Sequence, residues 1–181
     1  MALIDRFKDF LRSQNGLVID MDASNGEDSS LLKSFDYSGN GLTVFAKSGN
    51  GSLWASWSYK GTDAVVLISS EGIPFDIAAK DFETFLRLLK YGTGLIYQAL
   101  MALNLADLMD QTDEEALRRI DKDFLERELS LYQNSFPDYK ALYNFLNNEN
   151  IPEIENPERF FQDSKIIRDD FKQWKLENLN F

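Results

Sequence analysis

Four short apolar segments follow one another in residues 42–79, LTVFAKSGNGSLWASWSYKGTDAVVLISSEGIPFDIAA. The turn-forming stretches Asn50-Gly51, Lys60–Asp63 and Glu71-Gly72 separate them. Such tight turns join antiparallel strands, because a parallel crossover needs about a dozen residues or more. The segment is therefore predicted to be an antiparallel meander of four strands. Val65–Ser69 is almost wholly apolar, which is typical of a strand covered on both faces.

An amphipathic helix is predicted before the meander, over residues 2–13. Its apolar residues recur at the spacing of one helix face, and they are Leu3, Ile4, Phe7, Phe10 and Leu11. Asn15-Gly16 favours an end to this helix, because both residues tolerate positive φ. Leu17–Met21 predicts a further strand, and the polar stretch Asp22–Ser30 predicts a loop.

From Lys80 onward the hydrophobic period is that of helices. Asp81 is the predicted N-cap of a helix over Phe82–Leu89. Leu95–Met109 is apolar on most sides and is expected to be the most buried helix of the C-terminal half. Thr112–Glu115 has the pattern of a capping box and predicts a helix through about Tyr132.

Two more helices are predicted, one from Pro137 to about Asn147 and one over residues 158–178, with a loop at Asn150–Pro157 between them. The predicted fold class is α+β, an antiparallel meander sheet of four or five strands flanked by helices, with an all-helical C-terminal extension. We expect residues 1–93 to form the α+β domain. Residues 94–181 are expected to pack on it as a helical extension, giving one compact unit.

Composition excludes several classes of function. The chain has 181 residues, no Cys and no His. Disulfides, Cys/His zinc sites, Cys nucleophiles and His-dependent triads are therefore excluded, and we expect no metal and no cofactor. The formal net charge is −11, which disfavours nucleic acid and anionic membranes as partners.

The acidic side chains are concentrated in the C-terminal half of the chain. The N-terminus carries no targeting pattern. Residues 1–93 carry 12 acidic and 9 basic side chains, whereas residues 94–181 carry 18 and 10. No apolar run approaches the ~20 residues of a transmembrane helix. Asp5 and Asp9 come too early for a signal peptide. A soluble, cytoplasmic protein is expected.

Carboxylates are the abundant catalytic groups that remain. Glycosidases use a pair of them and need no His. Asp63, Glu71 and Asp76 lie near predicted strand ends, where such a pair can converge. A solvated acidic surface explains the same residues without catalysis. A carboxylate-dependent hydrolase is therefore one alternative function.

Two acidic stretches contain no Lys or Arg. The first comprises Glu149, Glu153, Glu155 and Glu158, and the second contains Asp107, Asp110 and Asp113, followed by Glu114 and Glu115. Such stretches are ordinarily solvated faces or helix N-termini. The alternative is a docking surface for a basic protein, because complementary charge speeds and orients association.

The aromatic strand around Trp54 and Trp57 offers a second kind of surface. Alternation places Trp54 on the face of Ser52, Ser56 and Ser58, and Trp57 on the apolar face. Trp54 either packs beneath a helix or forms an aromatic platform for a partner. We count it among the candidate partner-binding residues, beside the acidic ones.

Residues 39–91 resemble the SUKH superfamily, known also from a fungal cell-wall assembly regulator. The resemblance is carried by a Phe-Ala strand (Phe45-Ala46), the turn Ser48–Ser52, the apolar strand 65–69, the Glu71-Gly72 turn and the helix entry IAAKDFETFL at 77–86. The early helix ending in Asn15-Gly16 is similar to the family's first helix. The usual Trp- and Pro-bearing segment near the N-terminus is not apparent, and the C-terminal helical half extends beyond many members.

The resemblance implies a compact α+β domain without catalytic residues. It also implies that bacterial members are immunity proteins that neutralise polymorphic toxins by direct binding, whereas fungal relatives are interaction hubs. Many such toxins are basic nucleases, which the acidic composition of this chain would suit. The leading hypothesis is a non-enzymatic protein-binding module with a basic partner, most simply a toxin domain. A regulatory scaffold and a hydrolase are the alternatives.

Overall fold

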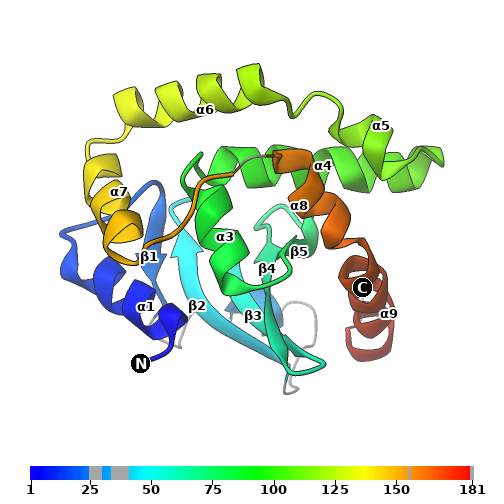
Figure 1. The fold of residues 1–181 in the computed structure, drawn as a ribbon. Helices are drawn as coiled ribbons and strands as arrows, with labels where there is room; N and C mark the ends of the chain where they lie inside the picture. The colour runs from blue at the N-terminus through cyan, green and yellow to red at the C-terminus, as the bar shows by residue number, and fades with distance from the viewer. Residues whose placement is uncertain (25–29, 34–40, 155, 180–181) are drawn as a thin grey trace.

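The computed structural model describes residues 1–24, 30–33, 41–154 and 156–179, and Figure 1 shows the whole arrangement. The strands are β1 Met21–Ala23, β2 Leu42–Ser48, β3 Leu53–Tyr59, β4 Thr62–Ile68 and β5 Phe75–Ala79. The helices are α1 Leu3–Ser13, α2 Ser30–Lys33, α3 Phe82–Leu89, α4 Thr93–Met109, α5 Asp113–Leu117, α6 Lys122–Ser135, α7 Tyr139–Asn148, α8 Pro157–Asp163 and α9 Lys165–Asn178. The fold is α+β, as predicted.

The sheet is an antiparallel meander in the order β1-β2-β3-β4-β5. Trp54 pairs with Leu67 and Ala55 with Val66, so β3 and β4 run in register over their whole length. Gly61, at φ 86°, makes the tight turn between these two strands. The predicted strands within residues 42–79 and their turns are therefore confirmed.

The first strand differs from its prediction. Leu17–Met21 was expected to be extended, but β1 is Met21–Ala23. Ile19 and Asp20 have φ values of 45° and 67°, and Val18 forms an isolated bridge back to Met21. A local turn, which apolar alternation does not reveal, therefore occupies the place of the expected strand.

Apolar side chains fill both faces of the sheet. One core joins Trp54, Val65 and Leu67 to side chains of α1, α3 and α4. The other core places Val66 and Ile68 with Phe171 of α9. The strand β4 is thus covered on both faces, as its apolar sequence predicted.

Two predicted helices are each divided in two. The expected helix from Thr112 to about Tyr132 is interrupted after Leu117, and α6 begins anew because the side chain of Asp121 accepts a hydrogen bond from Phe124 N at 2.8 Å. The expected helix over 158–178 is divided at Ser164, between α8 and α9. Within the described part of residues 94–181 there is no strand.

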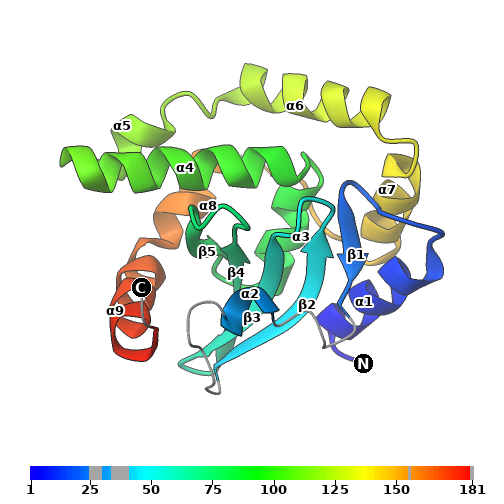
Figure 2. The ribbon, with the colours of Figure 1, turned by 180° about the vertical axis from the view of Figure 1, so that it is seen from behind.

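Helix α4 has six buried residues, more than any other described helix of the C-terminal half, as expected, although one side of it is exposed. One side contributes Leu95, Ile96, Leu100 and Leu103 to the first core, but Met101, Leu105, Leu108 and Met109 are exposed. Figure 2 shows α4 from behind, with α6 running above it. No helix among the described residues is long and apolar enough to cross a membrane.

A candidate partner-binding groove

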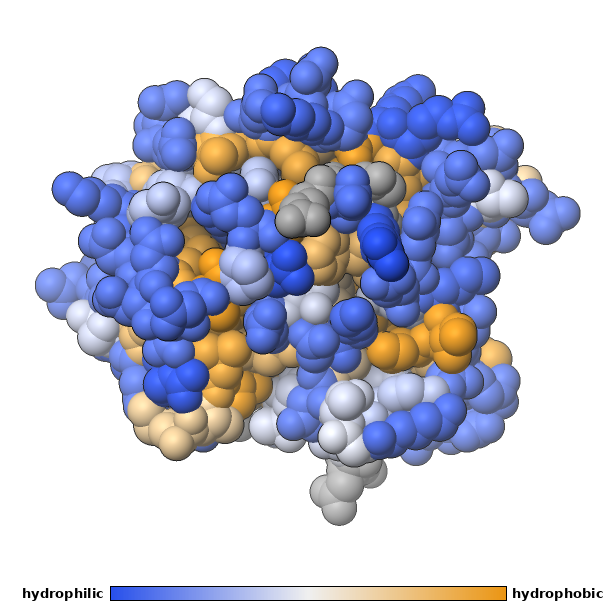
Figure 3. Space-filling model, viewed as in Figure 1, coloured by the Kyte–Doolittle hydropathy of each residue, from blue (hydrophilic) through white to orange (hydrophobic). Residues whose placement is uncertain are grey.

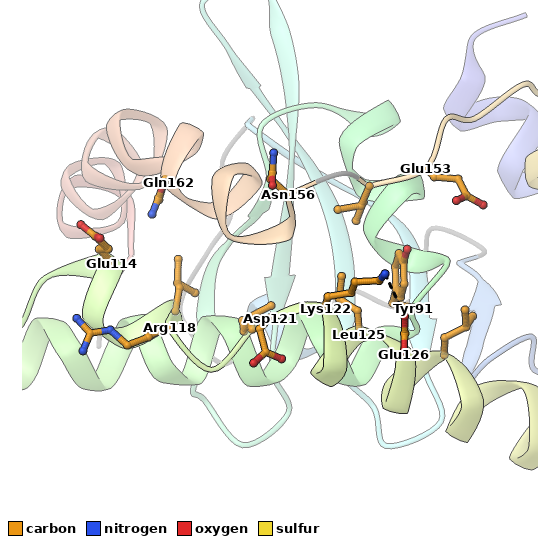
Figure 4. A pocket seen from close by; sticks show the side chains of 14 residues that line it. Tyr91, Glu114, Arg118, Asp121, Lys122, Leu125, Glu126, Glu153, Asn156 and Gln162 are labelled. Carbon is orange, nitrogen blue, oxygen red and sulfur yellow. Dashed lines mark ion pairs between the residues drawn. The ribbon is translucent and has the colours of Figure 1, made fainter.

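A groove of about 1130 Å³ opens beside α5 and α6. One wall is formed by α5, the α5–α6 connection and α6, and the other by Glu153, Ile154, Asn156 and Gln162. Figure 4 shows Asn156 and Gln162 on one side of it and Arg118 and Asp121 on the other. We call this hollow the acidic groove. Its lining residues are Tyr91, Glu114, Leu117, Arg118, Ile120, Asp121, Lys122, Leu125, Glu126, Leu129, Glu153, Ile154, Asn156 and Gln162.

The floor of the acidic groove is apolar. Leu117, Ile120, Leu125 and Ile154 are buried members of the first core, and Leu129 packs against that core. Lys122, Leu125, Glu126 and Leu129 follow the three- and four-residue spacing of one helix face, so α6 turns a mixed face toward the groove. In Figure 3 apolar surface is visible beneath the hydrophilic surface of α6.

Carboxylates lie on both walls of the groove. Glu114 and Glu126 come from α5 and α6, and Glu153 comes from the opposite wall. The ion pair between Lys122 and Glu126 is 3.7 Å long and highly exposed, so water screens it. Lys90 binds Glu153, and the pKa of that carboxyl is lowered chiefly by this hydrogen bond. Glu153 is therefore ionised at neutral pH.

Charged side chains on both walls of the groove influence the phenol of Tyr91. Burial raises the pKa of its phenol, and the nearby charges of Glu153 and Glu126 raise it further, while Lys90 opposes them. Its hydroxyl makes no hydrogen bond to any residue that the structure describes, although the side chain lines the groove. The floor thus offers a neutral phenol to an incoming polar group.

The members of the first predicted acidic stretch lie in different surroundings in the structure. Glu149 lies 2.7 Å from the guanidinium of Arg6, and Glu153 pairs with Lys90 and lines the groove. Glu155 and the side chain of Glu158 lie outside the described residues. The stretch contains no base in the sequence, but the fold brings cations to it, Arg6 from α1 and Lys90 from just after α3.

The members of the second predicted acidic stretch also lie in different surroundings. Asp113 is largely buried beside Arg168 of α9, whereas Asp107 lies at the surface and pairs with both Arg168 and Lys172. Neither belongs to a free single-signed surface. Asp110 is exposed, at the left-handed C-cap of α4, and does not line the groove. Glu114, which follows Asp113, is the member of this stretch that does line it.

Arg168 is the centre of a buried charge cluster. Its side chain is 1% exposed, and Nε and Nη2 donate to Asp76 Oδ2 at 3.1 and 3.0 Å. Asp107 and Asp113 lie 3.5 Å away, and Asn104 donates to Asp76 at 3.3 Å. A buried guanidinium needs such partners. These aspartates therefore fasten α9 to β5 and α4.

Trp54 is not an exposed platform. It is 1% exposed, and its Nε1 donates to Ser48 Oγ at 3.0 Å. Its ring lies 5.3 Å from that of Phe85 in α3. At Trp54 this face of β3 is covered by α3, which alternation alone could not show, whereas Ser58 on the same face is exposed. Trp57 is also buried, against Phe171, so neither tryptophan offers a surface anchor.

The three carboxylates of the hydrolase alternative do not converge. Asp63 lies at the β3–β4 turn and accepts a hydrogen bond from Ser58, whereas Glu71 follows the other end of β4. Asp76 is enclosed with Arg168. Among the residues that the structure describes, no group of three or more acidic side chains is placed to hold a metal ion.

Sequence reasoning missed most of the groove. Tyr91, Glu126, Leu129 and Ile154 were not singled out, since each belongs to a different or unremarkable local pattern. The mixed acidic and apolar face of α6 was the available signal. Comparison of the chain with protein-family models, with curated proteins and with solved structures finds no match in any of the three. Function is therefore inferred from the geometry of the groove.

Proposed function

We propose that the chain is a non-enzymatic protein-binding module that takes a basic, amphipathic segment of a partner protein into the acidic groove. The observation that carries this proposal is the composition of the two walls. Acidic stretches about 40 residues apart in the chain each contribute a carboxylate, Glu114 and Glu153, to opposite sides of an apolar floor. Glu126 adds a third.

The chemistry of the groove defines the segment that fits. The apolar floor favours leucine-like side chains, and the rim favours Lys or Arg above them. Helical segments present such a stripe when apolar residues recur three and four apart. The net charge of −11 would attract a basic partner over distances of about one Debye length, ~8 Å at physiological salt.

The class of partner follows from the resemblance of residues 39–91 to the SUKH superfamily. We propose a basic toxin domain, neutralised by direct binding, and hence the role of an immunity protein. A regulatory scaffold would use the same groove for several partners. The hydrolase reading has no support from the placement of Asp63, Glu71 and Asp76, because these carboxylates do not meet.

Synthetic helical peptides of about 18 residues, or five turns, provide the probe. A leucine/lysine amphipathic peptide should bind, and a leucine/glutamate peptide of the same pattern should not, as measured by fluorescence anisotropy. The double variant E114K/E126K should weaken binding about tenfold or more, about 1.4 kcal/mol. The control E83K/E177K changes the net charge equally at exposed sites on α3 and α9.

The control separates groove binding from general attraction. The proposal predicts that E83K/E177K binds the leucine/lysine peptide within about threefold of the unmodified chain, since distant charges are screened. Equal losses in the two double variants would show that net charge alone attracts the peptide. That result would overturn the assignment of the groove.

A further inference from the structure

The outward face of α4 is apolar and uncovered. Leu108 is 83% exposed, Met109 57%, Leu105 55% and Met101 38%. These residues are three, four or one apart and lie on one side of the helix, opposite the buried Leu95, Ile96 and Leu103. A contiguous exposed apolar stripe of this kind marks an interaction surface rather than an accident of composition. We call it the α4 stripe.

A cleft of about 710 Å³ lies beside the first half of this stripe. Met101 and Ala102 of α4 form one side, and Phe124 of α6 the other. The exposed residues Arg119 and Arg127 also line it. The α4 surface therefore carries a protruding apolar end, Leu108 and Met109, and a hollow end about six residues, or ~9 Å, away.

We propose that the α4 stripe binds a second copy of this chain, with the two α4 helices antiparallel across a two-fold axis at Leu105. A two-fold axis brings each protruding end to the other copy's hollow end, because the same patch serves both subunits. In this register Leu105 meets Leu105, Met109 meets Met101, and Leu108 meets the small Ala102. Large side chains thus oppose small or flexible ones, as close helix packing requires.

Charge complementarity supports the same arrangement. Asp110 follows Met109 at the protruding end and is exposed. Arg119 and Arg127 lie at the hollow end. The antiparallel pairing brings Asp110 of one copy toward these arginines of the other, twice per dimer.

The cleft adjoins the acidic groove, and the two share Arg118, Ile120 and Asp121, but they use different sides of α6. The groove uses Lys122, Glu126 and Leu129 of α6, whereas the cleft uses Phe124 and Arg127. At about 100° per residue these two sets lie on opposite sides of α6. The stripe offers four exposed apolar side chains, so we expect a dimer that dissociates on dilution rather than an obligate one.

Sedimentation velocity of the full chain at increasing concentration tests the proposal. The unmodified protein should shift from monomer to dimer, and L108E should weaken dimerisation at least about tenfold, because it places a charge in an apolar contact. The control is L176E, since Leu176 is 75% exposed on α9, away from the stripe. A monomer at all concentrations, or equal behaviour of L108E and L176E, would overturn the proposal.

A crosslinking experiment tests the register. The chain has no cysteine, so a single introduced thiol reports one position. Facing helices bring Cα atoms at a two-fold axis within the range of a disulfide, about 4.4–6.8 Å. L105C should therefore form a covalent dimer rapidly under mild oxidation, and L176C should not. If L105C crosslinks no faster than L176C, the axis does not lie at Leu105.

Discussion

The Arg168 cluster and the acidic groove use the same kind of residue in opposite ways. Around Arg168, the carboxylates of Asp76 and Asp113 are buried, Asp107 lies at the edge of the cluster, and all three pair with cations of the same chain. Around the groove, Glu114 and Glu126 are exposed beside an apolar floor. The difference teaches that the acidity of the C-terminal half has two roles. One part holds α9 on the sheet, and the other faces outward.

The largest expected effect comes from removing the cation at the centre of the Arg168 cluster. R168M should lower the free energy of unfolding by about 3–5 kcal/mol, because it leaves Asp76 buried without its cation. K172M is the control, since Lys172 also pairs with Asp107, at 2.7 Å, but is partly exposed. It should cost about 1 kcal/mol or less. Urea denaturation of both variants measures the difference, and equal losses would show that the cluster is not structural.

The next largest effect on stability concerns two tyrosines near the groove, Tyr139 and Tyr91. Tyr139 donates to the carbonyl of Lys90 at 3.0 Å in a buried setting, whereas the hydroxyl of Tyr91 has no partner among the described residues. Y139F should therefore cost about 1 kcal/mol of stability. Y91F should change stability by less than about 0.5 kcal/mol. Denaturation curves that rank the two variants in the reverse order would contradict the assigned hydrogen bonding.

Alkaline pH should reveal the buried setting of Tyr139 a second time, through its titration. Burial raises the pKa of Tyr139 to about 12, with the neighbouring Tyr143 and Tyr91 acting in the same direction. The unfolded phenol titrates near pH 10. A folded pKa above the unfolded one means that this stabilisation is complete below about pH 10 and is lost as pH rises toward 12. Absorbance titration should show a late phenolate that Y139F removes, and an unchanged titration would refute the assignment.

The smallest effect concerns the outward-facing carboxylates. E114K/E126K should change the free energy of unfolding by less than about 0.5 kcal/mol, because both side chains are exposed and their pairing is screened. The same variant is expected to lose peptide binding. Thermal unfolding measures the stability change. A loss of several kcal/mol would show that Glu114 and Glu126 stabilise the fold as the Arg168 cluster does. It would contradict the proposed difference between the two regions.

The sequence predicted the sheet well because its determinants are local. Turn residues such as Asn50-Gly51 and Gly61 fix where β3 begins and ends, and the alternation of β3 and apolar β4 fixes the rest. The helix divisions at Asp121 and Ser164 were missed. Asp121 is a cap residue inside an apolar-periodic stretch, and Ser164 keeps a helical backbone conformation and does not cap α9 with its side chain. Type and order of elements were therefore better predicted than their boundaries.

The candidate site was predicted poorly because its partners are distant in sequence. Glu149 meets Arg6 across 143 residues, Glu153 meets Lys90 across 63, and Asp76 meets Arg168 across 92. A stretch without bases in the sequence thus becomes a paired stretch in the fold. Helix α4 shows the converse, since its all-round apolar pattern predicted burial but leaves Leu108 exposed.

The most direct test of the central claim is to map where a basic amphipathic peptide binds. Methyl NMR spectra of the leucine- and isoleucine-labelled chain, titrated with the leucine/lysine peptide, provide the map. The account predicts that signals of Leu117, Leu129 and Ile154 shift saturably, while Leu105 and Leu108 of the α4 stripe do not respond. Shifts confined to Leu105 and Leu108, or no saturable shift at Leu129 and Ile154, would contradict the acidic groove as the partner-binding site.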